Sequence, residues 1–143
     1  MTAEDPHDLH RFVEAQDRGG AYTQAVAELR RGRKRSHWMW FVFPQLRGLG
    51  SSPMAVKYGI ASLDEARAYL AHPVLAPRLL ECAEILAGTE EESAETILGP
   101  IDAVKLRSSM TLFARADPEH AVFSRVLDRF FGGSPDPATL GRL

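Results

Sequence analysis

The sequence predicts an all-α fold, a single compact domain of about seven to eight short helices over residues 1–143. Three observations favour this class. Most segments repeat apolar residues at the period of a helix, and few alternate as a strand does. Ser, Asp and Pro stand where helices would begin, and Gly stands where they would end. The chain has the length of one domain, and no internal repeat or linker divides it.

Two helices are predicted in the first third of the chain. One begins after Asp8, and the next runs from about Ala21 until Gly32, where a glycine can end it. The apolar run SHWMWFVFP follows, and it suits a buried strand as well as a buried helix. We favour a helix capped by Ser36 and ended by Pro44, because a single strand in a helical domain leaves backbone groups unpaired.

Polar residues at five later positions are predicted to cap helices, because each can accept a hydrogen bond from a free amide of the first turn. They are Ser62, Ser93, Asp102, Asp117 and Asp136. The helices near these caps carry wide apolar faces, which indicate deep burial. We expect the core to include Leu79, Cys82, Phe123, Val126 and Leu127.

Composition and charge exclude several classes of protein. No apolar run approaches the roughly 20 residues that span a bilayer, and the N-terminus lacks the apolar core of a secretion signal. The net charge of −2 argues against a surface that binds nucleic acid over its whole extent. The one cysteine, Cys82, excludes an internal disulfide and suits a reducing compartment. We therefore expect a cytoplasmic protein that does not bind membranes and is a monomer or a weak dimer.

Motifs for metal binding or acyl transfer are absent from the sequence. His7, His10, His72 and His120 do not have the spacing of metal ligands, and a Gly-x-Ser-x-Gly elbow does not occur. We predict no metal and no cofactor.

A tract rich in cations and aromatic rings, RRGRKRSHWMWFVF, is the first candidate for a binding site. Five of the seventeen Lys and Arg residues lie between positions 30 and 35. Arg33, Arg35 and His37 with the flat rings of Trp38 and Trp40 suit a nucleotide-like ligand. The alternative is a solvated helix end followed by a core segment. The two Trp side chains point about 200° apart on a helix, so at most one is expected to face a given pocket.

The tract PQLRGLGSSP is the second candidate. Gly48 and Gly50 let the backbone approach a ligand, and they lead to a helix that begins near Pro53, whose free amides favour phosphate or carboxylate. The spacing is neither a Walker sequence nor a dinucleotide fingerprint. The alternative is a turn between helices in which Ser52 is a cap and nothing binds.

The helix that contains KLRSSMTLFA is the third candidate, because Lys105 and Ser108 border its apolar face. A Lys beside hydroxyl groups can bind phosphate, although Lys usually extends its stem over apolar surface and keeps the ammonium in water. Asp102 is most simply a cap of this helix, and its carboxylate can also orient Lys105 or Arg107.

These residues resemble a bacterial family, domain of unknown function 1810, over nearly the whole chain. The segments that carry the likeness are DLHRFVEAQ, GRKRSHWMWFVFPQLRGLGSS, YGIASLDEARAYLAHPVLAPRLLECA, KLRSSMTLFA and VLDRFFGGSPDPATL. This resemblance implies an α-helical fold but no established reaction. A more distant likeness is to the NADAR superfamily of helical proteins, which are tied to NAD and ADP-ribose metabolism. It implies, for an enzyme, hydrolysis of an N-glycosidic bond, but no NADAR catalytic acid matches a residue here.

The first hypothesis is a pocket for a phosphorylated or nucleotide-like small molecule. Cations would hold the phosphate, a tryptophan would stack on a ring, and polar side chains would orient or protonate the ligand. The predicted ligand-binding residues are Arg33, Arg35, His37, Trp38, Trp40, Gln45, Gly48, Gly50, Tyr58, Lys105 and Ser108. The hypothesis requires that Lys105 and Ser108 share one cleft with the basic tract, and that amides near Ser36 remain free.

The second hypothesis is a non-catalytic module whose basic tract binds an acidic protein partner or single-stranded nucleic acid. An open basic face would support it, and such binding should weaken steeply with salt.

Overall fold

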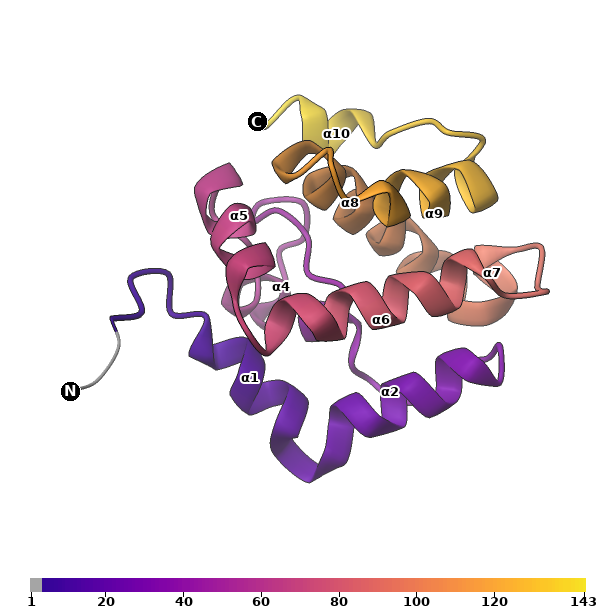
Figure 1. The fold of residues 1–143 in the computed structure, drawn as a ribbon, viewed down its shortest axis with the longest axis horizontal. Coiled ribbons are helices and arrows are strands. Elements are labelled where there is room, and N and C mark those ends of the chain that lie inside the picture. The colour runs from indigo at the N-terminus through magenta and orange to yellow at the C-terminus, as the bar shows by residue number, and fades with distance from the viewer. Residues whose placement is uncertain (1–3) are drawn as a thin grey trace.

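The computed structural model describes residues 4–143, and it confirms the all-α class (Figure 1). The helices are α1 (His10–Asp17), the 3₁₀ turn η1 (Arg18–Gly20), α2 (Ala21–Arg30), α3 (Met39–Val42), α4 (Pro53–Lys57), α5 (Leu63–Ala71), α6 (Leu75–Ala87), α7 (Ala94–Leu98), α8 (Pro100–Ala116), α9 (Ala121–Phe131) and α10 (Pro137–Leu140). Residues 4–143 form ten α-helices, against about seven to eight short helices predicted, and four of them, α3, α4, α7 and α10, have only four or five residues. Its β-type pairing is limited to one isolated bridge between Leu46 and Ile60.

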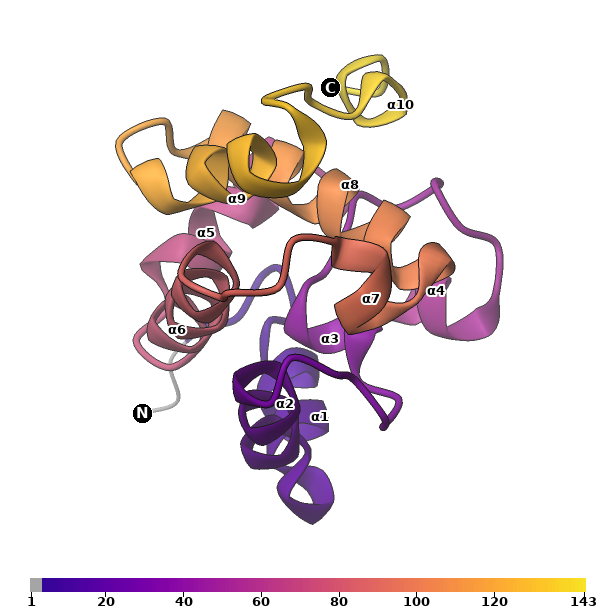
Figure 2. The same ribbon diagram turned by 90° about the vertical axis from the view of Figure 1, so that its right-hand side faces the viewer.

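The longest helix, α8, organises the molecule. It packs against α5, α7, α9 and α10, while α6 packs against both α9 and α2 (Figures 1 and 2). The helices α1 and α2 form the opposite end of the domain, and α3 lies between that end and α8 (Figure 2). Over residues 4–143, no helix combines the length and apolar character of a membrane span.

A chain of aromatic rings runs through the core and connects α1 to α9. The ring of Phe12 packs edge-on to Tyr69 at 5.2 Å between centroids, Tyr69 is 5.3 Å from Phe113, and Phe113 is 5.7 Å from Phe123. All four side chains are fully buried. The five residues predicted for the core, among them Cys82 and Phe123, are buried as well.

Burial also explains the state of the one cysteine. Loss of hydration raises the pKa of the Cys82 thiol to about 12, and a nearby Glu81 carboxylate contributes to the rise. The thiol is therefore a neutral core group at physiological pH.

The cap predictions were correct where a polar residue stands directly before a helix. The side chains of Ser52, Ser62, Ser93 and Asp136 each accept a hydrogen bond from a first-turn amide. Ser62 belongs to a reciprocal arrangement, because the Glu65 carboxylate reaches back to the amide of Ala61 over 3.1 Å.

Three cap predictions were wrong, each because another group determines where the helix begins. The helix α8 starts two residues before Asp102, since Gly99 adopts φ 87° and Pro100 occupies the first turn. The Asp117 carboxylate accepts a hydrogen bond from the Glu119 amide in a turn before the helix, and α9 begins only at Ala121. The short α3 begins at Met39, three residues after Ser36.

Candidate ligand site between helices α3, α4 and α8

Ser36 does not cap α3, because a carboxylate from α2 holds the segment that precedes it. One oxygen of Glu28 accepts hydrogen bonds from the amides of Arg35 (2.7 Å) and Ser36 (2.9 Å) and from Trp38 Nε1 (3.0 Å). The other oxygen accepts from Ser36 Oγ (2.6 Å) and Gln24 Nε2 (2.9 Å). Burial by itself would raise the pKa of the Glu28 carboxyl, but these hydrogen bonds outweigh it and hold the pKa far below its usual range.

This arrangement changes the expected role of the tract. The amides near Ser36, which were predicted to be free for a ligand, already bind an internal anion, Glu28. They cannot serve as the anion site unless that carboxylate leaves.

The Glu28 contacts divide the tract into inward and outward side chains. Trp38 is 1% exposed and belongs to the core, so it cannot stack on a ligand. The side chains of Arg33, Arg35 and His37 remain exposed on the surface. Lys34 points inward, and its amide donates a hydrogen bond to the Ile97 carbonyl over 2.7 Å. That bond holds the tract against the last turn of α7, just before α8 begins.

A cluster of two ammonium groups and one carboxylate lies at this contact. Lys34 Nζ is 3.0 Å from one oxygen of Asp102, and Lys105 Nζ is 3.5 Å from the other. The side chains are 9%, 17% and 21% exposed for Lys34, Asp102 and Lys105. Each ammonium also lies over an indole ring, Lys34 over Trp38 at 5.2 Å and Lys105 over Trp40 at 4.9 Å.

A narrow depression opens beside Lys105. Its lining comes from α3, α4, α8 and the segments between them, and consists of Met39, Trp40, Phe43, Gln45, Ala55, Tyr58 and Lys105. The free volume is about 10 Å³, enough for a single water molecule. Four of the residues predicted from the sequence therefore meet at one place: Trp40, Gln45, Tyr58 and Lys105.

Of the two glycines in the predicted ligand loop, only Gly50 borders this depression. A Cβ at Gly50 would lie 2.9 Å from the Ala55 Cβ and 3.5 Å from Gln45 Nε2. Gly48 has φ 100°, and a Cβ there would meet the Arg142 guanidinium at 2.7 Å. The helix that follows, α4, has five residues, and the Ser52 hydroxyl already accepts from the Ala55 amide.

Ser108 does not line the depression, although it lies only three residues from Lys105 on α8. Its hydroxyl is 3.1 Å from an Asp136 oxygen at the start of α10 and 3.2 Å from the Val104 carbonyl.

The first hypothesis therefore fails in the form stated above, because Ser108 lies outside the cleft and the amides near Ser36 are occupied. What remains is a smaller depression lined by Lys105, and Lys34 of the basic tract reaches Lys105 only through Asp102.

Lys34 and Asp102 are not among the predicted ligand-binding residues. For Asp102 the sequence provides part of the answer, since it stands three residues before Lys105 on one helix and was expected to be able to orient Lys105, which the 3.5 Å contact is consistent with. Lys34 could not be separated from its basic neighbours, because its orientation depends on Glu28 and Ile97, which lie elsewhere in the chain.

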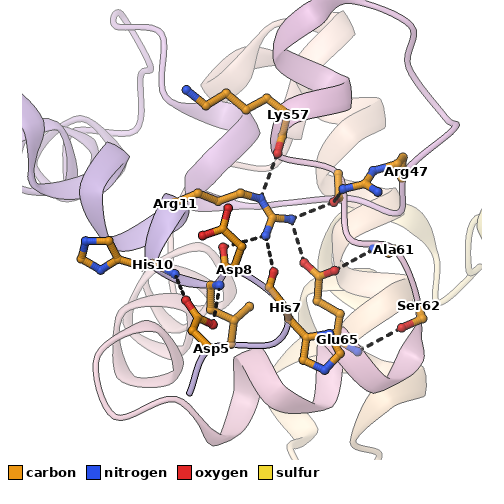
Figure 3. Close-up of polar contacts among 12 residues, drawn as sticks. Asp5, His7, Asp8, His10, Arg11, Arg47, Lys57, Ala61, Ser62 and Glu65 are labelled. Carbon is orange, nitrogen blue, oxygen red and sulfur yellow. Dashed lines mark hydrogen bonds and ion pairs between the residues drawn. The ribbon is translucent and has the colours of Figure 1, made fainter. Parts of the chain in front are cut away.

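A second polar cluster, around Arg11, is fully engaged within the protein (Figure 3). The Arg11 guanidinium bonds to the carbonyl oxygens of His7 (2.7 Å), Asp8 (2.8 Å), Lys57 (2.9 Å) and Gly59 (3.0 Å). It also bonds to the Glu65 carboxylate over 2.7 Å. Because a guanidinium has five N–H donors, none is left for a ligand, and we assign this cluster a structural role.

Comparison with known proteins identifies relatives of this chain. It is similar to the conserved hypothetical protein Rv1873 from Mycobacterium tuberculosis, with 56% sequence identity and a TM-score of 0.94. The match covers 97% of this chain and 98% of the other. No curated protein matches. The relation to the NADAR superfamily stays a prediction. The model of the family "Protein of unknown function (DUF1810)" matches residues 6–143, and the chain belongs to that family.

Proposed function

We propose that the chain binds a small phosphorylated or nucleotide-like molecule at the depression between α3, α4 and α8. One observation carries the proposal. The Lys105 ammonium lies over the Trp40 ring, and Lys105 lines the same depression as Gln45 and Tyr58. A cation for an oxyanion, an aromatic face for a ring and two polar side chains for orientation are the elements of such a site.

Lys105 is the group that contacts the anion. Its distance of 3.5 Å from Asp102 is longer than a charge-assisted hydrogen bond, which is typically about 2.7 to 2.9 Å. An ammonium has three donors, so Lys105 keeps donors that Asp102 does not use. Lys34 is less exposed and bonds to Asp102 at 3.0 Å, which makes it the partner that neutralises this carboxylate.

The size of the depression determines how a ligand can sit. A free volume of about 10 Å³ cannot hold a nucleobase. The ring of the ligand therefore lies at the mouth, against Trp40, or enters after Trp40 and Lys105 separate. In both cases the affinity depends on the Trp40 face and the Lys105 charge.

Binding measurements on two matched variants test the proposal. Thermal-shift and calorimetric titrations with nucleotides, sugar phosphates and ADP-ribose should find a ligand, which at a hundredfold excess over Kd adds about 2.7 kcal/mol to stability. Lys105→Met should abolish binding with little change in thermal stability, because Asp102 keeps Lys34. Arg35→Met, which removes an exposed charge outside the depression, should have little effect.

The exposed side chains of Arg33, Arg35 and His37 favour a second candidate, binding of an acidic partner or single-stranded nucleic acid. The same variants separate the two. The second candidate predicts that an oligonucleotide binds with a steep salt dependence, that Arg35→Met weakens this binding and that Lys105→Met does not alter it. That result would favour the second candidate over the first.

A further inference from the structure

The outer face of α8 carries two apolar side chains that the rest of the described chain leaves uncovered. Ile101 and Val104 are 73% and 63% exposed, more than any other large apolar side chain in residues 4–143. They stand three positions apart on the helix, about 60° around its axis, so they form one surface, which we call the α8 stripe. Scattered exposed apolar residues are ordinary, whereas adjacent ones on one helix face are typical of an interaction surface.

Cations border the α8 stripe on both sides. Helical spacing places Lys105 about 40° beyond Ile101 on one side and Arg107 about 60° beyond Val104 on the other. Lys34 adds a second cation on the Lys105 side, because both ammonium groups contact the same carboxylate, at 3.0 Å and 3.5 Å.

Arg107 is held in place by backbone oxygens rather than by an acid. Its Nε and Nη2 atoms donate hydrogen bonds to the carbonyl oxygens of Ser134 and Pro135, at 3.0 Å each. Within residues 4–143 it forms no ion pair, and its Nη1 donors are uncommitted. The guanidinium therefore keeps its charge and part of its hydrogen-bonding capacity for another molecule.

The two acids that contact this surface are already engaged. Asp102 lies between the two lysines, and Asp136 accepts hydrogen bonds from the hydroxyls of Ser108 and Thr139. The three bordering cations and these two carboxylates carry a net charge of about +1, taking each at its usual ionisation. The exposed side chains of Arg33 and Arg35 extend the positive charge along the neighbouring tract.

We infer that the α8 stripe docks an acidic segment of another protein, one that places an aliphatic side chain between carboxylates. The aliphatic group covers Ile101 and Val104, and the carboxylates on either side face Lys105 and Arg107. This surface is separate from the proposed ligand site, because neither residue of the stripe lines the depression.

The chemistry of the stripe favours a protein segment over the other possible occupants. Nucleic-acid bases stack on flat rings, which the branched side chains of Ile and Val do not offer. Two copies of this chain that met at the stripe would bring positively charged borders together, and like charges across an interface are unfavourable. A stripe of two side chains also predicts a small interface, as in a weak and transient complex.

Selection from a peptide display library tests which chemistry the surface prefers. The full chain is presented with random peptides, and the enriched peptides are synthesised and titrated by fluorescence anisotropy. We expect sequences in which Leu, Ile or Val is flanked by Asp or Glu, with affinity that falls as salt is added. Replacing the acids of such a peptide by Asn and Gln should weaken binding by about tenfold.

Ile101→Ser and Val104→Ser should each weaken the enriched peptide by about tenfold, because each removes apolar area from the contact. Both side chains are exposed, so the fold should tolerate the changes. Val56→Ser is the matched control, since Val56 is 50% exposed but lies on α4, and it should leave the affinity unchanged.

Three results would overturn the inference: enrichment of basic peptides, enrichment of peptides that bind Ile101→Ser as tightly as wild-type protein, or no enrichment. A dimer in sedimentation experiments that Ile101→Ser abolishes would assign the stripe to a second copy instead. An oligonucleotide that Ile101→Ser weakens would assign it to nucleic acid. The proposed function is tested separately, because Ile101→Ser should not alter small-molecule titrations, whereas Lys105→Met should abolish them.

Discussion

Trp38 Nε1 donates a hydrogen bond to the Glu28 carboxylate over 3.0 Å, so the core indole at the start of α3 is tied to the last turns of α2. The same oxygen accepts the amides of Arg35 and Ser36. These bonds fix the course of the chain from α2 to α3, and with it the inward direction of Lys34. Glu28 therefore shapes the candidate site without taking part in it.

Replacing Glu28 by Gln should destabilise the protein by about 3 kcal/mol, because hydrogen bonds to a buried charge are lost and an amide N–H₂ group is turned toward donors. Urea unfolding measures the change. Gln24→Ala, which removes one donor of the carboxylate, is the matched control and should cost about 1 kcal/mol. Equal losses in both variants would contradict the central role of Glu28.

The low pKa of Glu28 also predicts how its contribution depends on pH. The folded-state pKa of Glu28 is depressed below its ordinary value of 4.5, so this stability is fully present above about pH 4.5 and is lost as pH falls below it. Between pH 5 and pH 3, the free energy of unfolding should fall more in wild-type protein than in Glu28→Gln. Urea unfolding at the two pH values measures both free energies, and an equal fall in wild-type protein and in Glu28→Gln would exclude the effect.

The sequence predicts local features of this fold better than distant ones. Ser62 and Asp136 were identified as caps because a cap and its amide lie within four residues of each other. Ser36 looked equally suitable, but its hydroxyl binds Glu28, eight residues earlier. A pattern of neighbours cannot show that a carboxylate from another helix has taken the amides.

The candidate site illustrates the same limit. Trp40, Gln45, Tyr58 and Lys105 were selected for their chemistry, and the fold brings them together. Ser108 was selected with Lys105 for the same reason, yet it faces α10. Side chains three positions apart on a helix point only about 60° apart, so the sequence could not show that α10 takes Ser108 while Lys105 borders the depression.

The Arg11 cluster should carry much of the stability at the N-terminal end. Arg11→Met leaves the Glu65 side chain, 4% exposed, without its cation and removes the donors to several carbonyl oxygens, so we expect a loss of about 3 to 5 kcal/mol. Arg18→Met is the control. Its ion pair with Glu14 joins side chains that are 72% and 59% exposed, so the loss should be about 0 to 1 kcal/mol. Similar midpoints for the two variants in chemical denaturation would show that Arg11 is not structural.

Phe123→Ala should cost about 3 to 5 kcal/mol, because the side chain is fully buried at one end of the aromatic chain and its removal leaves a cavity. Phe130→Ala, on the same helix but only partly buried, should cost clearly less. Both values come from urea unfolding. A loss under about 1 kcal/mol for Phe123→Ala would mean that the core closes around the missing ring.

Two adjacent serines on α8 provide the last prediction, since they differ in hydrogen bonding rather than in burial. Ser108 and Ser109 are 3% and 0% exposed. The Ser108 hydroxyl bonds to Asp136, whereas Ser109 Oγ is a buried oxygen without a partner in residues 4–143. An unsatisfied hydroxyl costs about 1 to 3 kcal/mol, and Ala removes it. Ser109→Ala should therefore leave stability unchanged or raise it by up to about 1 kcal/mol.

Ser108→Ala, by contrast, should lower stability by about 1 kcal/mol, because Asp136 loses one of the donors that hold the start of α10. The difference between the two variants in denaturant midpoint is the quantity to measure, since both lose the same atom from the same helix. A larger loss for Ser109→Ala would show that its hydroxyl has a partner in solution. Because Ser109 lies one turn beyond Lys105, titration of the variant with nucleotides, sugar phosphates and ADP-ribose would then show whether that partner belongs to the ligand site.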